Sequence, residues 1–513
     1  MTDGEVTSHG TAFHNRVAIA LLVFILLIGA FLRMYGLGSR SLWADEFCTW
    51  HVSRMEFGES LRWAPELTKP PLYQLCLRAI SRDPHPPEWL LRLPACIAGV
   101  LTIFAAFALG RVTGGLTTGL SAAGLLACNL LQVQYSQEAR PYSFLVLGAS
   151  LSMLWWHHLV RKPTWSGVIM YVVTTALTFH ANYLMCLVVL AQGLWLALCF
   201  RGRPRDRDLW RPIIALTIAA VLCAPMVIHY LRWRSSTFQG LGWIKPPTWS
   251  DALAVLEKIT YGPFWVVVVL VPALLLWIMA SIRNRAALCP LQTLEKGSIS
   301  GSRTVVRLFD GPLDLCGLLL VWLVCSWFGL MVISWIAHPA MVDRYALPAA
   351  MPAILLPLIV AHRLDRRLPV VLLTVFATMG VRDWTQERLD VEPGFRELSK
   401  YLAEAVDPEK DAIVLTIDRK THPDWDDAER LAFQYYPVRN YPIKELLLAP
   451  DGVTAMNDVF RDPRGMYLVV LWADPFAILK AADRRPELFM IEGQTYTQLL
   501  FSPYRVIRVS PMD

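Results

Sequence analysis

Eleven mostly apolar runs in the first 382 residues constrain the fold of this chain more than any other feature. A helix that crosses a lipid bilayer needs roughly 20 such residues, and the runs approach this length. We place the spans near 15–34, 90–110, 115–134, 142–160, 166–180, 182–200, 211–230, 260–282, 313–336, 346–362 and 367–382. Because 55% of the 513 residues are hydrophobic and only 18% are charged, the sequence predicts a polytopic α-helical membrane protein.

The first run, from about Val17 to Leu32, has the position of a signal peptide but not the cleavage site that should follow one. It is followed by "LRMYGLGSR", which lacks the small-residue cleavage site of a signal peptide. We therefore expect it to stay as the first membrane helix.

Basic residues in alternate loops predict the orientation of the chain. They occur at Arg111, at 161–162, in 201–211, in 283–307 and in 362–367. Short cytoplasmic loops collect Lys and Arg, so we expect these loops and the N-terminus to be cytoplasmic. The net charge of +6 agrees with this bias, and the sequence shows no aromatic and basic module typical of nucleic-acid binding.

The remaining long segments then fall on the extracytoplasmic side. Residues 35–89 form a long first outer loop, in which we expect helices along the membrane interface, and 231–259 form a second. After about residue 383 a helix-like run, "GFRELSKYLAEAV", precedes the strand-like runs "AIVLTI", "MYLVVLWA" and "YRVIRV". We thus divide the chain into a membrane domain, 1–382, and a small extracytoplasmic α/β domain, 383–513.

The ten cysteines show no CxxC or Cys/His ligand spacing, which argues against a structural zinc site. Cys48 and Cys76 lie in the same outer loop, and their spacing leaves open whether they form a disulfide.

Ionisable and polar residues from distant parts of the sequence meet at the predicted outer face. They are Asp45 and Glu46, Thr68 to Tyr73, Gln134 to Tyr142, Phe179 to Tyr183, and His338 to Tyr345. Taken singly, each set has an ordinary explanation, such as an acidic helix start, a lysine that reaches the headgroups or a structural salt bridge. Their convergence beside a bilayer, where charges are costly, predicts a functional site.

Five motifs, four of them at these polar segments, resemble the integral-membrane GT-C glycosyltransferases of the protein O-mannosyltransferase and aminoarabinose-transferase type. They are "LWADE" after the first span, "KPPLY", "EWLLRLPACIAGVLTIFAAFALGR", "YSQEARPYSFLVL" and "DRYALPAAMP", in this order. The resemblance implies a GT-C fold and the transfer of a sugar from a polyprenyl-phosphate carrier, with inversion, to a hydroxyl of a lipid, glycan or protein. The expected setting is a bacterial-type inner membrane, with membrane lipids but no nucleic acid as partners.

The resemblance also implies roles for individual residues. Asp45 would be the base that accepts the proton of the acceptor hydroxyl, and Glu46 would support it, or both acids would hold a divalent metal cation. Cations suit the growing charge of the phosphate leaving group, and the candidates are Lys69, Arg140 and Arg344. The expected substrate contacts are Tyr73, Glu138, Tyr142, His180, Tyr183, Asp343 and Tyr345.

The sequence departs from the family pattern in several respects. Some family members carry His where this chain has Lys69, the later loop motifs of the protein-modifying branch are missing, and the tail is not a β-trefoil-like insert. The donor sugar and the acceptor therefore stay open. A transporter or flippase of lipid-linked sugars would instead need broken or ionisable segments at the bilayer midplane and a two-fold repeat, while a non-catalytic scaffold would leave the converging charges unexplained.

Overall fold

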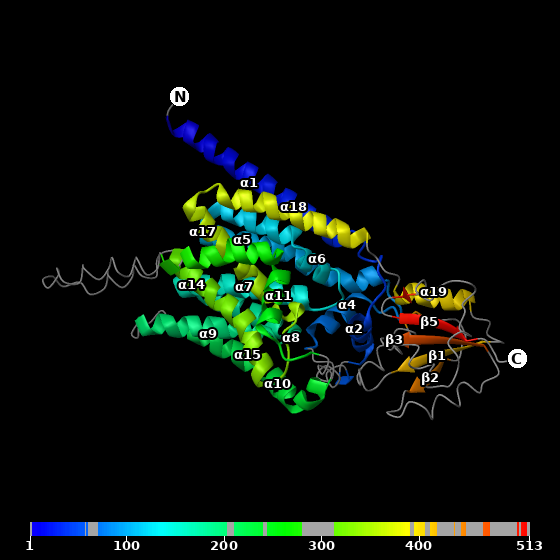
Figure 1. Ribbon diagram of the computed structural model, residues 1–513. Coiled ribbons are helices and arrows are strands. Elements are labelled where there is room, and N and C mark those ends of the chain that lie inside the picture. The colour runs from blue at the N-terminus through cyan, green and yellow to red at the C-terminus, as the bar shows by residue number, and fades with distance from the viewer. Residues whose placement is uncertain are drawn as a thin grey trace.

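Helices make up most of the computed structural model (Figure 1). The structure describes residues 3–56, 58–59, 70–202, 210–239, 244–276, 278–279, 312–389, 394–405, 411–417, 435–436, 443–447, 465–471, 500–501 and 504–509. In the first half the helices are α1 (Asp3–Met34), α2 (Ala44–Arg54), α4 (Leu72–Ile80), α5 (Glu88–Cys128), α6 (Leu130–Ser136), α7 (Tyr142–Arg161), α8 (Trp165–Ala181), α9 (Met185–Gly202) and α10 (Trp210–Gln239).

The second half continues the helical bundle. Its helices are α11 (Trp249–Ile259), α12 (Gly262–Phe264), the π-helix η2 (Trp265–Leu270), α14 (Pro312–Leu323), the π-helix η5 (Val324–Phe328), α15 (Gly329–Ile336), α16 (Asp343–Ala346), the 3-10 helix η6 (Leu347–Ala349), α17 (Ala350–Leu364), α18 (Leu368–Leu389) and α19 (Phe395–Ala405). Helices α2 and α4 lie in the first outer loop, where helices were expected, and their position along the membrane interface stays a prediction.

Seven helices in the described part of the chain are long and apolar enough to cross a membrane. The count is eight if α11 and the helical segment Gly262–Leu276, which meet at an angle of 95°, are taken as one span. One source of the difference from eleven is α5, whose 41 residues cover two of the expected spans and turn at Gly115. Gly115 has φ 85° and ψ −172°, a conformation that glycine adopts readily because it lacks a Cβ. In addition, α8 and α9 are apolar but shorter. The protein is thus a polytopic helical membrane protein, and the count of eleven spans stays a prediction.

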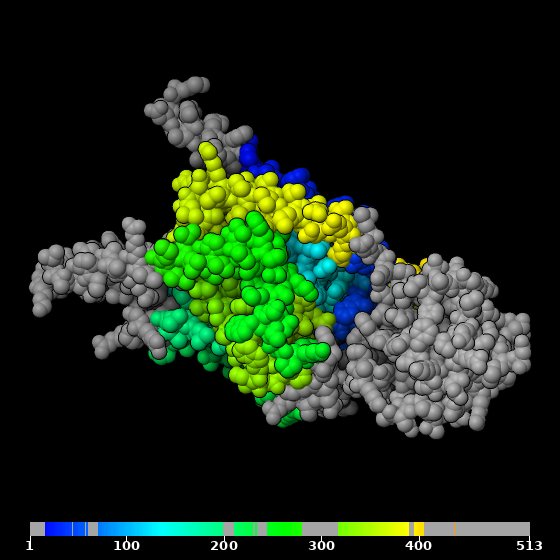
Figure 2. Space-filling view, viewed as in Figure 1, coloured from blue at the N-terminus to red at the C-terminus, as the bar shows by residue number. Residues whose placement is uncertain are grey.

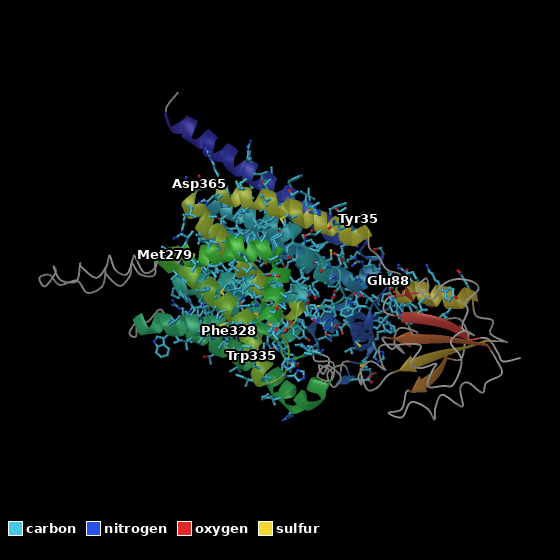
Figure 3. The ribbon with its side chains drawn as sticks, viewed as in Figure 1. Tyr35, Glu88, Met279, Phe328, Trp335 and Asp365 are labelled. Atoms are coloured by element: carbon cyan, nitrogen blue, oxygen red, sulfur yellow. The ribbon has the colours of Figure 1, made fainter. Side chains whose placement is uncertain are left out.

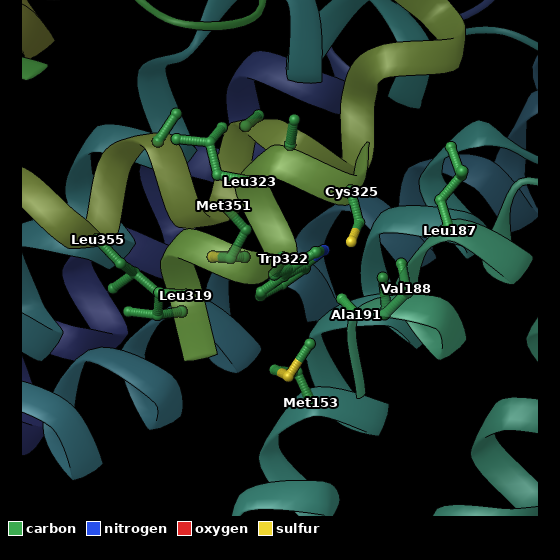
Figure 4. Close-up of a cluster of buried hydrophobic side chains, with 14 of the residues drawn as sticks. Met153, Leu187, Val188, Ala191, Leu319, Trp322, Leu323, Cys325, Met351 and Leu355 are labelled. Atoms are coloured by element: carbon green, nitrogen blue, oxygen red, sulfur yellow. The ribbon is translucent and has the colours of Figure 1, made fainter. Parts of the chain in front are cut away.

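The core of the bundle lies between α7, α9, η5, α14 and α17. Figure 4 shows Trp322 of α14 among side chains from the other helices, with Met351 of α17 on one side and Ala191 of α9 on another. All three are buried, as are Met153 of α7 and Cys325 of η5. Burial of these apolar side chains by dispersion and close packing fixes the helices that carry the polar segments at their ends.

The described surface of the bundle is apolar over the helices at its edge. In Figure 2, α18 (yellow) and the helices around residues 250–279 (green) cover the face turned to the viewer. Val371 and Val375 of α18 and Val267 and Val268 of η2 are exposed. Exposed apolar side chains along whole helices suit contact with lipid.

The two ends of the bundle carry different segments. Figure 3 places Tyr35 and Glu88 at one end and Met279 and Asp365 at the other. The two ends of the first outer loop therefore lie away from two of the basic loops, as expected. Which end faces the cytoplasm stays a prediction.

Beyond the Tyr35 end lies a mixed β-sheet (Figure 1). Its strands are β1 (Asp411–Ile417), β2 (Ile443–Leu447), β3 (Gly465–Leu471), β4 (Leu500–Phe501) and β5 (Tyr504–Val509), in the order β2-β1-β3-β5-β4. β1 is parallel to β2 and β3, and β5 is antiparallel to β3 and β4. Strands β1, β3 and β5 coincide with the three strand-like runs in the sequence, and the extracytoplasmic α/β domain as a unit stays a prediction.

Candidate active site

Asp45 lies in the first turn of α2, where an acid is stabilised by the positive end of the helix dipole. Its carboxylate oxygen Oδ2 is 2.8 Å from Nη2 of Arg140 and 3.8 Å from Nη1 of Arg344. The three residues come from the first outer loop, the α6–α7 turn and the start of α16. The structure thus brings together three of the polar segments that the sequence placed on one face.

Arg140 is fixed against α2 from several sides. Its Nη1 donates to the backbone oxygen of Asp45 at 3.0 Å and to Oγ1 of Thr49 at 3.4 Å, and its Nη2 donates to the Tyr142 hydroxyl at 3.5 Å. The Arg140 side chain is buried, whereas the Asp45 side chain is 27% exposed. Both of these ion pairs engage the same oxygen, Oδ2, of the Asp45 carboxylate.

Glu46 is fully buried and lies in a different environment from its neighbour. Arg92 binds it through two charged hydrogen bonds, from Nε to Oε1 at 2.8 Å and from Nη2 to Oε2 at 2.7 Å, and the Ala139 N–H donates to Oε1 at 2.6 Å. Both oxygens of Glu46 are occupied by protein donors. The pair Asp45 and Glu46 therefore does not fit a divalent cation in this arrangement, and no group of three or more His, Cys, Asp or Glu suited to a metal occurs in the described ranges.

A second carboxylate, Asp343, lies at the start of α16. Its Oδ1 accepts hydrogen bonds from the Tyr135 hydroxyl at 3.1 Å and from the Arg344 N–H at 2.7 Å, and its Oδ2 is 3.9 Å from Nζ of Lys258 at the end of α11. Burial raises the pKa of Tyr135, and the nearby carboxylates of Glu138 and Asp343 raise it further. Tyr135 therefore keeps its proton and acts as the donor to Asp343.

Aromatic rings line the space around the two arginines. The guanidinium carbon of Arg344 lies 5.9 Å from the ring centre of Trp43 and 5.7 Å from that of Tyr345, and Arg140 lies 5.7 Å from the ring of Tyr142. Cations above such rings gain electrostatic stabilisation when they are shielded from water. The predicted contacts Tyr142 and Tyr345 thus belong to the same cluster as Asp45.

Glu138 lies in the α6–α7 turn, where the charges of Asp45, Glu46 and two arginines act on it. Removal from water raises the pKa of its carboxyl well above the ordinary value of 4.5, and repulsion from Glu46 and Asp45 raises it further. Its Oε2 is buried without a hydrogen-bond partner among the described residues. Glu138 therefore binds a proton more readily than an ordinary glutamate.

The turn that carries Glu138 and Arg140 is held in place by α1. Arg33, buried in the first span, donates to Oγ of Ser136 at 3.2 Å and to the backbone oxygens of Leu126 and Ala127 where α5 ends. Nε2 of Gln137 donates to the backbone oxygens of Leu32, Arg33 and Tyr35. The buried arginine thus caps a helix end and fixes the neighbouring turn.

The other predicted site residues have different contacts. Lys69 is outside the described residues. Tyr73 is fully buried, and its hydroxyl donates to the Leu91 backbone oxygen at 3.1 Å. In the last turn of α8, His180 bonds the Ala176 backbone oxygen at 2.8 Å, and in the α8–α9 turn the ring of Tyr183 contacts Phe179. Cys76 carries a free thiol, so no disulfide joins it to Cys48.

The structure also adds residues to the candidate set that were not selected from the sequence. Arg92 pairs with Glu46, Thr49 accepts from Arg140, and Tyr135 donates to Asp343. The sequence did contain a signal for Arg92. It is an arginine at the start of an apolar span, and a charge in a membrane needs a partner. Thr49 and Tyr135 carried no such signal.

Comparisons with known proteins agree with this architecture. Residues 68–229 match the family model of dolichyl-phosphate-mannose-protein mannosyltransferases. ArnT from Cupriavidus metallidurans bound to undecaprenyl phosphate is similar in structure, with a TM-score of 0.52 and 13% identity over 96% of this chain and 99% of that one. The apo state of the same protein gives a TM-score of 0.53 and 12% identity over 98% and 100%. No curated protein sequence matches this chain significantly.

At such low identity the structural likeness shows the fold alone. It extends over nearly the whole chain, whereas the family model covers only residues 68–229. Together they confirm the resemblance drawn from the motifs, which is to the GT-C superfamily of membrane glycosyltransferases that use polyprenyl-phosphate sugars.

Proposed function

We propose that this chain transfers a sugar from a polyprenyl-phosphate carrier to a hydroxyl acceptor at the extracytoplasmic face of a bacterial-type inner membrane. The observation that carries the proposal is a partly exposed carboxylate, Asp45, set beside the guanidinium groups of Arg140 and Arg344. The family match and the ArnT-like fold support the class of reaction, because ArnT has been crystallised with undecaprenyl phosphate.

Asp45 acts as the base in this proposal. The acceptor hydroxyl attacks the anomeric carbon while its proton passes to Oδ1 of Asp45, and the bond from the anomeric carbon to the phosphate oxygen breaks. Its electron pair leaves with the lipid phosphate, so a single displacement inverts the anomeric centre. Arg140 holds Oδ2 and thereby directs Oδ1 toward the acceptor.

Arg344 stabilises the phosphate leaving group. Charge grows on the phosphate oxygens as the glycosidic bond breaks, and a fixed guanidinium lowers the barrier most where that charge develops. The Arg344–Asp45 separation of 3.8 Å is a weak ion pair compared with 2.8 Å for Arg140. We assign the phosphate to Arg344, and Lys69 from the first outer loop would add a second cation.

Glu46 has a supporting function. Its hydrogen bonds with Arg92 and the Ala139 N–H tie α2 to α5 and to the α6–α7 turn. This three-way contact places Asp45 opposite Arg140. Tyr142 and Tyr345 complete the site with hydroxyls that can bind the sugar or the phosphate, and Tyr73 is left out because its hydroxyl already bonds Leu91.

Binding of the carrier and transfer of the sugar test this proposal separately. Purified full-length protein is given undecaprenyl phosphate, and its dissociation constant is measured for wild type, Arg344→Ala and Arg54→Ala. Arg54 is the matched control, because it is an exposed cation at the other end of α2. We expect Arg344→Ala to weaken binding by about tenfold or more, as loss of a charged hydrogen bond implies, and Arg54→Ala to leave it unchanged.

Transfer is followed with synthetic undecaprenyl-phosphate donors that each carry one radiolabelled sugar, with source-cell membranes as acceptor. The proposal requires that at least one donor loses its sugar to a membrane acceptor and that this reaction is lost in Asp45→Asn. Carrier binding that is equal in wild type and in Arg344→Ala would remove the phosphate assignment.

A further inference from the structure

We propose that Tyr436, from the C-terminal part of the chain, is a positioning residue that holds the segment before α2 and so presents Asp45 to the site. This inference rests on the proposed function of Asp45. Its basis is a contact between the membrane domain and residues more than 340 positions later in the sequence.

The Tyr436 hydroxyl makes two hydrogen bonds to the membrane domain. It accepts the backbone N–H of Leu42 at 3.1 Å and donates to Oε1 of Glu88 at 2.8 Å. Leu42 lies three residues before Asp45, and Glu88 is the first residue of α5. One hydroxyl thus connects the entry to α2 with the start of the central helix.

The ring of Tyr436 also contacts α2 itself. It lies edge-on to the ring of Phe47, with 6.0 Å between ring centres and an angle of 89°, and it stacks on Phe395 of α19 at 6.1 Å. Phe47 is fully buried and lies two residues after Asp45. Aromatic pairs of this geometry stabilise a contact beyond the area that they bury. The aromatic contact therefore fixes the face of α2 that does not carry Asp45.

A charged residue of α19 holds the same segment. Nη1 of Arg396 lies 3.1 Å from Oε1 of Glu88 and donates to the backbone oxygen of Gly38 at 3.0 Å. Arg396 also donates to the backbone oxygen of Ser39. The Ser399 hydroxyl in turn donates to the Tyr436 backbone oxygen at 3.0 Å. Tyr436 and α19 are therefore bonded to each other and bind the segment before α2 together.

The segment from residue 37 to 43 is consequently held from two directions. Arg92 binds the backbone oxygens of Leu37, Arg40 and Ser41 from the α5 side, at 2.9 to 3.0 Å. Tyr436 and Arg396 bind it from the C-terminal side. A base displaced by even 1 Å can lose about 100-fold in rate, so loss of the Tyr436 contact should slow transfer without affecting carrier binding.

The test compares Tyr436→Phe with Tyr435→Phe in the full-length protein. Tyr435 is the matched control, because its hydroxyl donates to the Pro86 backbone oxygen and not to the segment before α2. We expect Tyr436→Phe to lower kcat for transfer from an undecaprenyl-phosphate sugar by about 10- to 100-fold, with the dissociation constant of undecaprenyl phosphate unchanged. Tyr435→Phe should keep the wild-type kcat.

Amide hydrogen exchange gives a readout that does not depend on activity. Because the Leu42 N–H loses its acceptor in Tyr436→Phe, peptides covering residues 37–43 should exchange faster than in wild type or Tyr435→Phe. Ser399→Ala is a milder second variant, which releases only the Tyr436 backbone oxygen. It should show the same pattern with a smaller change, and it keeps the test valid if Tyr436→Phe does not fold.

Three outcomes decide the proposal. Equal kcat and equal exchange at 37–43 in the Phe variants of residues 435 and 436 would overturn it. So would an equal loss of kcat and carrier binding in both variants, because that describes general destabilisation. If Asp45→Asn transferred sugar at the wild-type rate, the proposed function would fail, and exchange at 37–43 would still decide whether Tyr436 holds the segment.

Discussion

Replacement of Arg92 by methionine perturbs the contact that positions the two acids of α2. All five N–H groups of the Arg92 guanidinium donate hydrogen bonds: two to Glu46 and one each to the backbone oxygens of Leu37, Arg40 and Ser41. Methionine fills a similar volume but offers no donor. The variant therefore leaves the fully buried Glu46 carboxylate without its cation.

The magnitude follows from that burial. Removal of one partner from a buried ion pair costs about 3–5 kcal/mol of unfolding free energy, because the remaining charge is uncompensated. We expect this loss for Arg92→Met. A further change of Glu46 to glutamine removes the stranded charge, so the double variant should recover about 1–3 kcal/mol relative to Arg92→Met alone.

Tryptophan fluorescence of the purified protein, titrated with SDS in mixed micelles, measures the unfolding free energy of the four proteins, wild type, both single variants and the double variant. The 20 tryptophans provide the signal. If Arg92→Met differed from wild type by less than about 0.5 kcal/mol, or if the double variant showed no recovery, the account of Glu46 as a buried structural anion would be refuted.

Two other predictions concern Glu138 and the orientation of the chain. Because the pKa of Glu138 is raised, we expect Glu138→Gln to gain thermal stability relative to wild type as the pH rises above about 4.5, measured as the difference in Tm. For orientation, exposed Lys400 of α19 and exposed Lys162 after α7 are each changed to cysteine in a cysteine-free background. In intact cells a membrane-impermeant thiol reagent should label Lys400→Cys and not Lys162→Cys, and the reverse would contradict the predicted topology.

The direction expected for Glu138 follows from proton linkage. Above pH 4.5 the unfolded chain releases this proton while the folded protein keeps it, so each pH unit lowers wild-type stability by at most about 1.4 kcal/mol until the folded pKa is passed. Glutamine does not titrate, so the stability of Glu138→Gln does not fall with pH for this reason. The other titrating groups contribute equally to the pH dependence of stability in both proteins. A Tm difference that stayed constant between pH 4.5 and 8 would contradict the raised pKa.

Much of the fold could be predicted from the sequence because hydrophobic length alone marks membrane helices. The basic loops also indicated which polar segments share a face, and Asp45, Arg140 and Arg344 do meet in the structure. The apolar pattern, with Arg111 between two runs, predicted two spans in this region, but it did not identify Gly115 as the point at which α5 turns.

The pairing of the charges could not be predicted from the sequence. "LWADE" presents two adjacent acids, yet the helix sends them to opposite environments, since successive residues are about 100° apart around the axis. Asp45 faces the cluster of arginines, whereas Glu46 faces Arg92 in the interior. The Tyr436 contact with Leu42 was also hidden, because residues nearly 400 positions apart meet only after the chain has folded.

The rate of sugar transfer by Asp45→Asn tests the central claim most directly. Asparagine nearly preserves the shape of the side chain but cannot accept the proton of the acceptor hydroxyl. The account predicts that undecaprenyl phosphate still binds, while transfer from the undecaprenyl-phosphate sugar falls by about 100-fold or more. Transfer at the wild-type rate by Asp45→Asn would contradict the assignment of Asp45 as the base.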